Sequence, residues 1–392
     1  MSAGRLRVVT IVGTRPEVIR LSRTIARLDA TFDHLLVHTG QNYDYELNGV
    51  FFEELGLRPP DHYLAVDTSS LGRFLGGTLV AVEQMLLELR PDAVLVLGDT
   101  NSCISAVMAK RLQVPVYHME AGNRCFDPNV PEEVNRSLVD HVADFNLVYT
   151  EAARRNLLAE GLPTQRITLT GSPMAEVLSH YGAAIRSSRV LADLELDAGG
   201  YVLVSAHREE NVDEPARLEL LVRTLEVLRD ELDRPVLVST HPRTRQRLEA
   251  FGVEARNGVT FHKPFGFLDY VQLQQHAYCV LSDSGTIAEE SSILGFPAVT
   301  LRDAIERPEA LETGAIVTAG LEPAVVIDAV RQVVAQWEAG EVPTTPAEYQ
   351  ILDCSQRVVN LIRSTAHGYH DRVGIRRRSP HWRNQPESTG AP

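Results

Sequence analysis

The feature that most constrains the fold of this chain is a repeated alternation between short, continuous apolar runs and longer amphipathic stretches. Continuous runs rich in β-branched residues, separated by helical segments, are typical of parallel strands covered by helices on both faces. The expected strands form two series, one over residues 8–13, 35–39, 93–98, 114–118 and 145–149, the other over residues 201–205, 236–240, 279–282, 298–301 and 315–317. Two such series predict an α/β protein with two Rossmann-like, doubly wound domains.

The boundary between the two series is expected within residues 176–200, where a helical stretch leads into the turn-like sequence DAGG. We therefore predict a first domain over residues 1–185 and a second over residues 186–365. Residues 366–392 concentrate arginine, proline, serine and glycine, which predicts a basic, solvated or disordered tail. A length of 392 residues suits two domains better than one.

Composition and charge exclude several classes of function. The formal net charge of −14 argues against a basic, fold-wide nucleic-acid surface, although a few arginines and helix N-termini can still bind a phosphate locally. No apolar run approaches the roughly 20 residues of a membrane span, so we expect a cytoplasmic protein without a membrane partner. The four cysteines are far apart and form no CxxC pair, so neither a disulfide framework nor a metal site is expected.

The motif GTRPE, residues 13–17, follows the first expected strand. Thr14 and Glu17 match a capping box, so one interpretation is simply a well-made helix start. In the other, Arg15 and Arg20 place cations at the carboxyl edge of the sheet, where open α/β sheets bind ligands. No GxGxxG follows any strand, which disfavours NAD.

Carboxylates stand where further strands end. Asp99 follows residues 93–98, where an ordinary helix N-cap is the alternative interpretation. Glu120 leaves a buried strand for a glycine-containing loop, a costly place for an unpaired charge. Glu132 follows in PEEVNR, with Arg136 close by. Acids that converge on one cleft raise one another's pKa, as general acid–base catalysis requires.

Basic residues occupy the same position in the second series. His207 and Arg208 leave its first strand, and His241 leaves the next strand along the chain. A single histidine is usually structural, but a His-Arg pair at a strand end is also suited to a ligand phosphate between the domains.

The sequence DSGTIAEE predicts a phosphate site. Ser284, Gly285 and Thr286 are expected to open a helix whose free backbone N–H groups hold a diphosphate. Glu290 lies one turn further along and is placed to accept both hydroxyls of a ribose, and Arg307 follows the next strand. An ordinary N-cap at the aspartate or serine that begins the segment is the alternative.

Nine segments occur together in the order and spacing of one known family. They are GTRPE, TGQNYDYEL, LGDTNS, HMEAGNR, PEEVNR, TGSPMAEVL, SAHREEN, DSGTIAEE and ERPE. On these segments the chain resembles the non-hydrolysing UDP-N-acetylglucosamine 2-epimerase family, over nearly its whole length to about residue 365. Details such as HMEAGNRCFD are most similar to the branch that converts UDP-2-acetamido-2,6-dideoxy-L-talose to UDP-N-acetyl-L-fucosamine.

The resemblance implies a glycosyltransferase-B architecture with an interdomain cleft, a homodimer, a UDP-N-acetylhexosamine substrate, no cofactor and no metal. The implied catalytic residues are Asp99, Glu120, Glu132 and His207. The implied substrate- and UDP-binding residues are Arg15, Arg20, Arg136, His241, Ser284, Gly285, Thr286, Glu290 and Arg307.

The implied reaction inverts C2 of a UDP-2-acetamido sugar. UDP leaves C1 while a carboxylate removes the C2 proton, and UDP adds back to the 2-acetamidoglycal after reprotonation on the opposite face. The UDP-GlcNAc/UDP-ManNAc pair and the 6-deoxy-L-talose/L-fucose pair both fit, because no motif identifies the C6 substituent. A glycosyltransferase of the same fold, a hydrolysing 2-epimerase and a non-catalytic nucleotide-sugar sensor are the alternatives.

Overall fold

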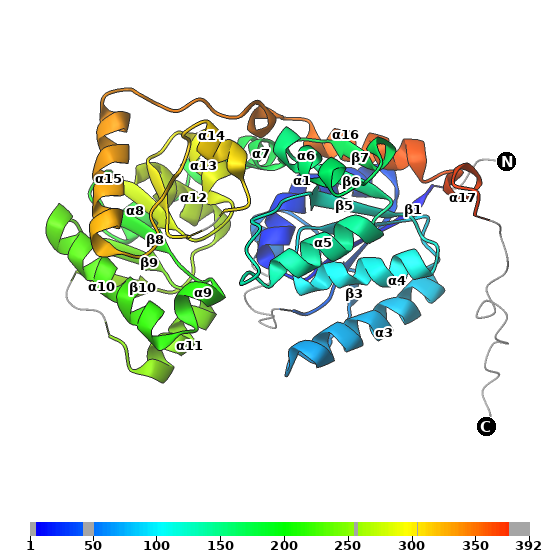
Figure 1. Cartoon of the computed structure of the whole chain (residues 1–392), viewed down its shortest axis with the longest axis horizontal. Helices are drawn as coiled ribbons and strands as arrows, with labels where there is room; N and C mark the ends of the chain where they lie inside the picture. The colour runs from blue at the N-terminus through cyan, green and yellow to red at the C-terminus, as the bar shows by residue number, and fades with distance from the viewer. Residues whose placement is uncertain (1–4, 42–50, 255–257, 304, 376–392) are drawn as a thin grey trace.

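The computed structural model describes residues 5–41, 51–254, 258–303 and 305–375. Within them the chain forms two α/β units side by side, each built on a wholly parallel sheet (Figure 1). The predicted fold class is therefore confirmed. None of the described helices is both long and apolar enough to cross a bilayer.

The first sheet has the strand order β3-β2-β1-β4-β5-β6-β7. Its strands are β1 (Arg7–Val12), β2 (Asp33–His38), β3 (His62–Tyr63), β4 (Ala93–Leu97), β5 (Val116–Ala121), β6 (Phe145–Val148) and β7 (Ile167–Leu169). The helical segments around it are α1 (Arg15–Thr31), α3 (Leu71–Leu89), η1 (Asn101–Ile104), α4 (Ser105–Arg111), α5 (Glu132–Val142), α6 (Glu151–Ala159), η2 (Thr164–Arg166) and α7 (Met174–Arg186). The strand order reverses between β1 and β4, which opens a crevice at the carboxyl ends of these strands.

The second sheet has the order β10-β9-β8-β11-β12-β13 and reverses between β8 and β11. Its strands are β8 (Val202–Ser205), β9 (Val236–Ser239), β10 (Val259–His262), β11 (Cys279–Ser282), β12 (Ala298–Thr300) and β13 (Val317–Thr318). The helical segments that follow α7 are α8 (Val190–Asp193), α9 (Glu209–Val212), α10 (Pro215–Leu232), α11 (Pro242–Phe251), α12 (Phe267–His276), α13 (Ile287–Leu294), α14 (Pro308–Glu312), α15 (Pro323–Glu338), η3 (Ala347–Gln350), α16 (Cys354–Thr365) and α17 (Tyr369–Arg372).

Both faces of each sheet are buried, which is why the strands read as continuous apolar runs. On β1, Val8 and Val12 join the core beneath α1, whereas Val9 and Ile11 join the core beneath α3 and α4. Ten strands lie where the sequence predicts them, with ends shifted by a few residues. The short edge strands β3, β7 and β10 were missed, because an edge strand carries too few buried residues to form an apolar run.

Helix α16 returns from the second unit to the first and packs on α1, as the upper right of Figure 1 shows. Val358 and Ile362 belong to the same core as Leu21 and Ile25 of α1. Beyond α16, the Tyr369 ring is buried and its hydroxyl bonds to Asp144. Residues 376–392 of the predicted tail lie outside the described residues, and the domain boundaries at 185 and 365 remain predictions.

Candidate active site

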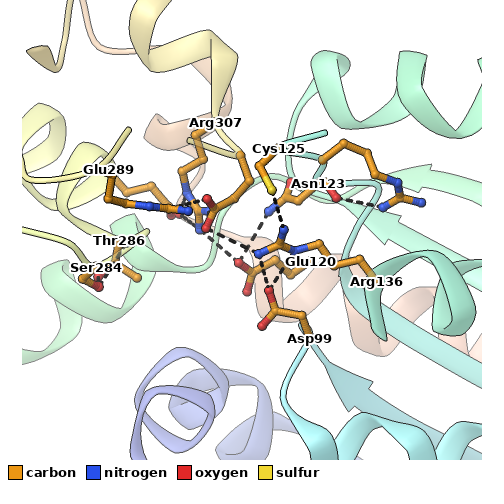
Figure 2. A network of polar contacts seen from close by, with 12 residues as sticks. Asp99, Glu120, Asn123, Cys125, Arg136, Ser284, Thr286, Glu289 and Arg307 are labelled. Carbon is orange, nitrogen blue, oxygen red and sulfur yellow. Dashed lines mark hydrogen bonds and ion pairs between the residues drawn. The ribbon is translucent and has the colours of Figure 1, made fainter. Parts of the chain in front are cut away.

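The loops at the carboxyl ends of the two sheets face one another across a cavity of about 380 Å³. Most of the predicted site residues line it: Arg15, Arg20, Asp99, His207, His241, Ser284, Gly285, Thr286 and Glu290. Glu120, Arg136 and Arg307 lie beside the cavity in a network of ion pairs (Figure 2), and Glu132 lines a separate, smaller cavity. Among the described residues, no group of three His, Cys, Asp or Glu side chains is arranged to hold a metal ion.

The GTRPE motif forms the predicted capping box. The backbone N–H groups of Gly13 and Thr14 donate to the Glu17 carboxylate at 2.9 and 2.7 Å. Gly13 is required by close packing, because a Cβ there would lie 1.8 Å from the Ser102 hydroxyl oxygen. Glu17 is only 2% exposed, and burial raises its pKa to about 7. The sequence assigned Glu17 to capping alone, yet it also lines the cavity.

The two arginines of the first helix lie in the cavity, as expected. The Arg15 guanidinium lies over the Phe51 ring, 4.9 Å from its centroid. The Arg20 guanidinium donates to the Glu120 carboxylate, which overcomes the effect of burial and raises the pKa of Arg20. The helix start and the two cations that line the cavity are therefore both present, and ligand binding by the arginines stays a prediction.

Glu120 lies at an irregularity in β5, not after the strand as the sequence predicted. The pairing of β5 with β6 shifts register between Met119 and Ala121, and Glu120 between them has a left-handed backbone with φ of 63°. That conformation is strained for a residue with a Cβ and is typical of functional sites. The bulge aims the carboxylate at Arg20 and at Arg307, whose Nη2 lies 3.0 Å from Oε1 (Figure 2).

Asp99 is held by an arginine and is not a helix cap. Thr100 occupies the N-cap position of η1, and the Arg136 guanidinium lies 2.7 Å from the Asp99 carboxylate. Burial alone raises the pKa of Asp99, but Arg136 outweighs it and holds this pKa below its usual value. Arg136 also pairs with Glu133 at 2.7 Å, which fixes the guanidinium from a second side.

Glu132 stands apart from the other two carboxylates. It begins α5 and lines a cavity of about 160 Å³ together with His207 and Arg208. The structure thus brings Asp99 and Glu120 to the main cavity from neighbouring strands. It places Glu132 on the far side of His207.

His207 is oriented by a buried aspartate. The Asp283 carboxylate, which is fully buried, accepts the backbone N–H groups of His207 and Arg208 at 2.9 and 3.0 Å. Asp283 therefore holds the loop that contains His207 and Arg208 in place and does not cap α13. The His207 and His241 rings lie 5.5 Å apart, and burial lowers the pKa of both, that of His241 to about 4. For both residues the shift favours the uncharged imidazole.

The predicted diphosphate loop leads into α13 with Thr286 at its N-cap, and its residues line the cavity. Within the loop, the Ser284 N–H donates to Ser282 Oγ at 3.0 Å and the Thr286 N–H donates to Ser284 Oγ at 3.4 Å. Gly285 is crowded, because a Cβ there would lie 2.6 Å from an oxygen of Glu306. Glu290 accepts a hydrogen bond from Gln274 at 2.6 Å, and burial raises its pKa. The loop and the Glu290 carboxylate thus line the same cavity.

Sequence reasoning missed several charged residues beneath this loop. Glu306 is buried within reach of Arg208, Arg302 and Arg307, and although burial opposes it, these arginines hold its pKa well below the usual range. Glu289 is fully buried against Arg307. Each directly precedes a residue that the motifs did single out, Glu290 or Arg307. In AEE only Glu290 lines the main cavity, whereas Glu306 and Arg307 of ERPE both lie beside it. The signal was therefore a second charged residue next to each predicted one.

Two parallel sheets whose carboxyl edges face one interdomain cavity define the glycosyltransferase-B class of fold. Within that class, the family model described as UDP-N-acetylglucosamine 2-epimerase matches residues 26–363. The chain belongs to this family, and the protein is an isomerase of this type.

Three comparisons with known proteins agree with this family. The structure of UDP-N-acetylglucosamine 2-epimerase from Rickettsia bellii is 42% identical, with a TM-score of 0.87 over 95% of this chain and 100% of that one. The Methanocaldococcus jannaschii UDP-GlcNAc 2-epimerase in complex with UDP-GlcNAc and UDP is 34% identical, with a TM-score of 0.86 over 92% and 100%. A UDP-2,3-diacetamido-2,3-dideoxy-D-glucuronate 2-epimerase from Pseudomonas aeruginosa is 34% identical over 83% of this chain and 92% of its own length.

Proposed function

We propose that the protein catalyses non-hydrolysing C2 epimerisation of a UDP-2-acetamido sugar, by elimination of UDP and its re-addition to a 2-acetamidoglycal. One observation carries the proposal: Asp99 and Glu120 of the first unit lie at or beside one cavity, opposite the α13 N-terminal loop of the second. Carboxylates and an anion-binding loop on opposite walls suit a substrate that exchanges a C–H proton at one end and carries a diphosphate at the other.

The second unit is proposed to hold UDP. Residues 284–286 line the cavity together with Arg15 and Arg208. The backbone N–H groups at this helix start and the two guanidiniums are proposed to supply positive charge for a diphosphate. Glu290, one turn into α13, is proposed to accept the ribose hydroxyls. As the C1–O bond breaks, negative charge grows on the departing UDP, and preorganised donors of this kind stabilise it. The Methanocaldococcus relative is in complex with UDP-GlcNAc and UDP, which supports a UDP-sugar as the ligand.

The first unit is proposed to move the C2 proton. C2–H is not adjacent to a carbonyl, so its removal is feasible only as UDP leaves C1. Inversion then needs a proton acceptor on one face of the sugar and a donor on the other. Asp99, Glu120 and Glu132, with His207 near the diphosphate, are the residues proposed for these steps. The ion pairs that hold Asp99 and Glu120 keep both carboxylates oriented.

The sugar is proposed to be either of the UDP-GlcNAc/UDP-ManNAc pair or of the UDP-2-acetamido-2,6-dideoxy-L-talose/UDP-N-acetyl-L-fucosamine pair. The Pseudomonas relative is named for a 6-carboxylated sugar, so enzymes at this level of similarity differ at C6. A few pocket contacts are enough to select this substituent.

A homodimer is proposed on surface composition. Helix α3 exposes Leu71 and Val80, and α5, on the other side of α4, exposes Val134 and Leu138, all of them large apolar side chains. A second copy of the chain that covered these helices would remove that apolar surface from water.

Proton NMR in deuterated water tests the proposal, with UDP-GlcNAc and the 6-deoxy-L-talose sugar as separate substrates. The expected result is the C2 epimer of one of them, with deuterium at C2. Free sugar together with UDP would instead indicate the hydrolysing reaction. Transfer of the sugar to an added acceptor without C2 exchange would indicate a glycosyltransferase. Unchanged spectra with both sugars would contradict the proposed function.

A further inference from the structure

We propose that Glu289 and Ser172 are positioning residues that hold Arg307 against the catalytic carboxylate Glu120, an inference that rests on the proposed function. Neither residue lines the main cavity, so neither is placed to touch the substrate. Both act through Arg307, whose guanidinium reaches from the second unit to Glu120 of the first (Figure 2).

Arg307 is bound more extensively by Glu289 than by Glu120. Its Nε lies 2.7 Å from Glu289 Oε1 and its Nη2 approaches the same oxygen, whereas a single Nη2 contact of 3.0 Å reaches Glu120. Arg307 is only 3% exposed, so water cannot substitute for these partners. The direction in which the guanidinium points is therefore set mainly by Glu289.

Ser172 fixes Glu289 in turn. Its hydroxyl donates to the second carboxylate oxygen, Oε2, while the same hydroxyl oxygen accepts the Met174 N–H at 3.1 Å. Since a serine hydroxyl has one hydrogen, that hydrogen is committed to Glu289. Ser172 and Glu289 are both fully buried. Both oxygens of Glu289 are thus engaged, and the carboxylate has no freedom to rotate away from Arg307.

Glu289 supplies a close negative charge in this cluster. Glu120 faces two guanidiniums, those of Arg20 and Arg307. Glu306 lies farther from Arg307, at 4.0 Å, and is shared with Arg208 and Arg302, so Glu289 is the carboxylate that neutralises Arg307 at short range. Without it, an excess positive charge would be buried at the catalytic carboxylate, an arrangement that costs several kcal/mol per unpaired ion.

The same contacts cross between the two units twice. Ser172 follows β7 of the first unit and binds Glu289 on α13 of the second, and Arg307 of the second unit binds Glu120 of the first. Glu289 and Arg307 therefore link the two units at two points. Any variant that weakens Ser172–Glu289 weakens the approach of Arg307 as well.

The test uses Glu289→Gln and Ser172→Ala, with Glu176→Gln and Ser355→Ala as matched controls. Glu176 and Ser355 are also a buried glutamate–serine pair, joined by a hydroxyl-to-carboxylate bond, but they lie outside the cavity and its ion pairs. The kinetic assay is C2 deuterium exchange, and the Kd of UDP is measured by calorimetry on the same samples.

Glu289→Gln is expected to lower kcat by about 10- to 100-fold, the size of effect that a misplaced reacting group produces. Ser172→Ala is expected to give a smaller loss, and the double variant to be no worse than Glu289→Gln alone, because Ser172 acts through Glu289. The Kd of UDP should stay within about threefold of wild type, Glu289→Asp should recover part of kcat, and the controls should keep wild-type kcat. Equal losses of kcat in the control pair, or an unchanged kcat in Glu289→Gln, would overturn the proposal.

A crystal structure of Glu289→Gln gives a readout that does not depend on activity. We expect the Arg307 guanidinium to leave its 3.0 Å contact with Glu120. If the wild-type protein exchanges no C2 proton, the proposed function has failed, and the positioning role is then decided by this structure alone. An Arg307 guanidinium that keeps its wild-type position in Glu289→Gln would refute the positioning role.

Discussion

Arg136 on α5 lies 2.7 Å from the carboxylate of Asp99, the residue that follows β4 by two positions. The contact joins two neighbouring βα units at the carboxyl edge of the first sheet. It keeps Asp99 ionised and pointed at the cavity, where a helix-capping aspartate would instead be occupied by backbone N–H groups.

Asp99→Asn is expected to lower kcat for C2 exchange by about 10²- to 10⁴-fold, the range for loss of a general acid or base, with little effect on the Kd of UDP. Asp92→Asn is a matched control, because Asp92 caps the opposite end of the same strand through the Arg7 N–H. Single-turnover kinetics and calorimetry on both variants check this. A large loss of UDP affinity in Asp99→Asn would assign Asp99 to binding.

Two substitutions of Glu120 distinguish the role of its carboxylate from the role of its left-handed backbone conformation. Glu120→Ala and Glu120→Gly both remove the carboxylate, so both should lose activity and leave Arg20 and Arg307 without their shared counter-ion. Only glycine adopts a φ of 63° without strain. Glu120→Gly should therefore be more stable than Glu120→Ala by about 1 kcal/mol, measured by urea unfolding. Equal stability would show that the bulge relaxes when the side chain is removed.

Glu17 makes stability depend on pH in a direction opposite to that of an ion-paired carboxylate. Its pKa is about 7 in the folded protein against 4.5 when exposed, so the folded state binds the additional proton between these values. Stability contributed by this group is present below pH 4.5 and is lost as the pH rises towards 7. The free energy of unfolding of wild type, minus that of Glu17→Gln, should fall between pH 5 and pH 7.5. A difference that rises, or that follows the surface control Glu83→Gln, would contradict the burial argument.

Gly13→Ala tests the close packing at the end of β1. The added Cβ would meet the Ser102 and Thr39 hydroxyl oxygens at 1.8 and 2.4 Å, so we expect a loss of about 1–3 kcal/mol in the free energy of unfolding. Gly76→Ala is the control, because no atom lies within 4 Å of a Cβ at this exposed helical site. That variant should gain about 0.5–1 kcal/mol. Thermal and urea unfolding of both variants are the measurements.

Elements and site residues whose position has a local cause could be predicted from the sequence. An apolar run bounded by turn residues is visible without any partner, so the central strands and the helix that GTRPE begins were predicted. Position at the end of a strand likewise placed Arg15, His207 and Ser284 at the cavity, because all parallel strands present their carboxyl ends to one edge.

Residues whose role or conformation depends on a partner far away in the sequence could not be predicted. Asp283 shapes the loop at His207 from 76 positions away, and Ser172 binds Glu289 from 117 positions away. The left-handed backbone of Glu120 depends on how β5 pairs with β6, which no local pattern encodes. Glu132 was grouped with Asp99 by charge and spacing, but the direction of α5 sends it to a separate cavity.

The return of α16 to α1 has a consequence for synthesis of the chain. Val358 and Ile362 complete the apolar layer that covers α1, yet the ribosome makes them more than 300 residues after the strand that α1 follows. The second unit is finished, or nearly so, before the first can close its core. The core around α1 is therefore completed only after α16 has been made, so we expect part of the apolar surface of α1 to stay uncovered until then.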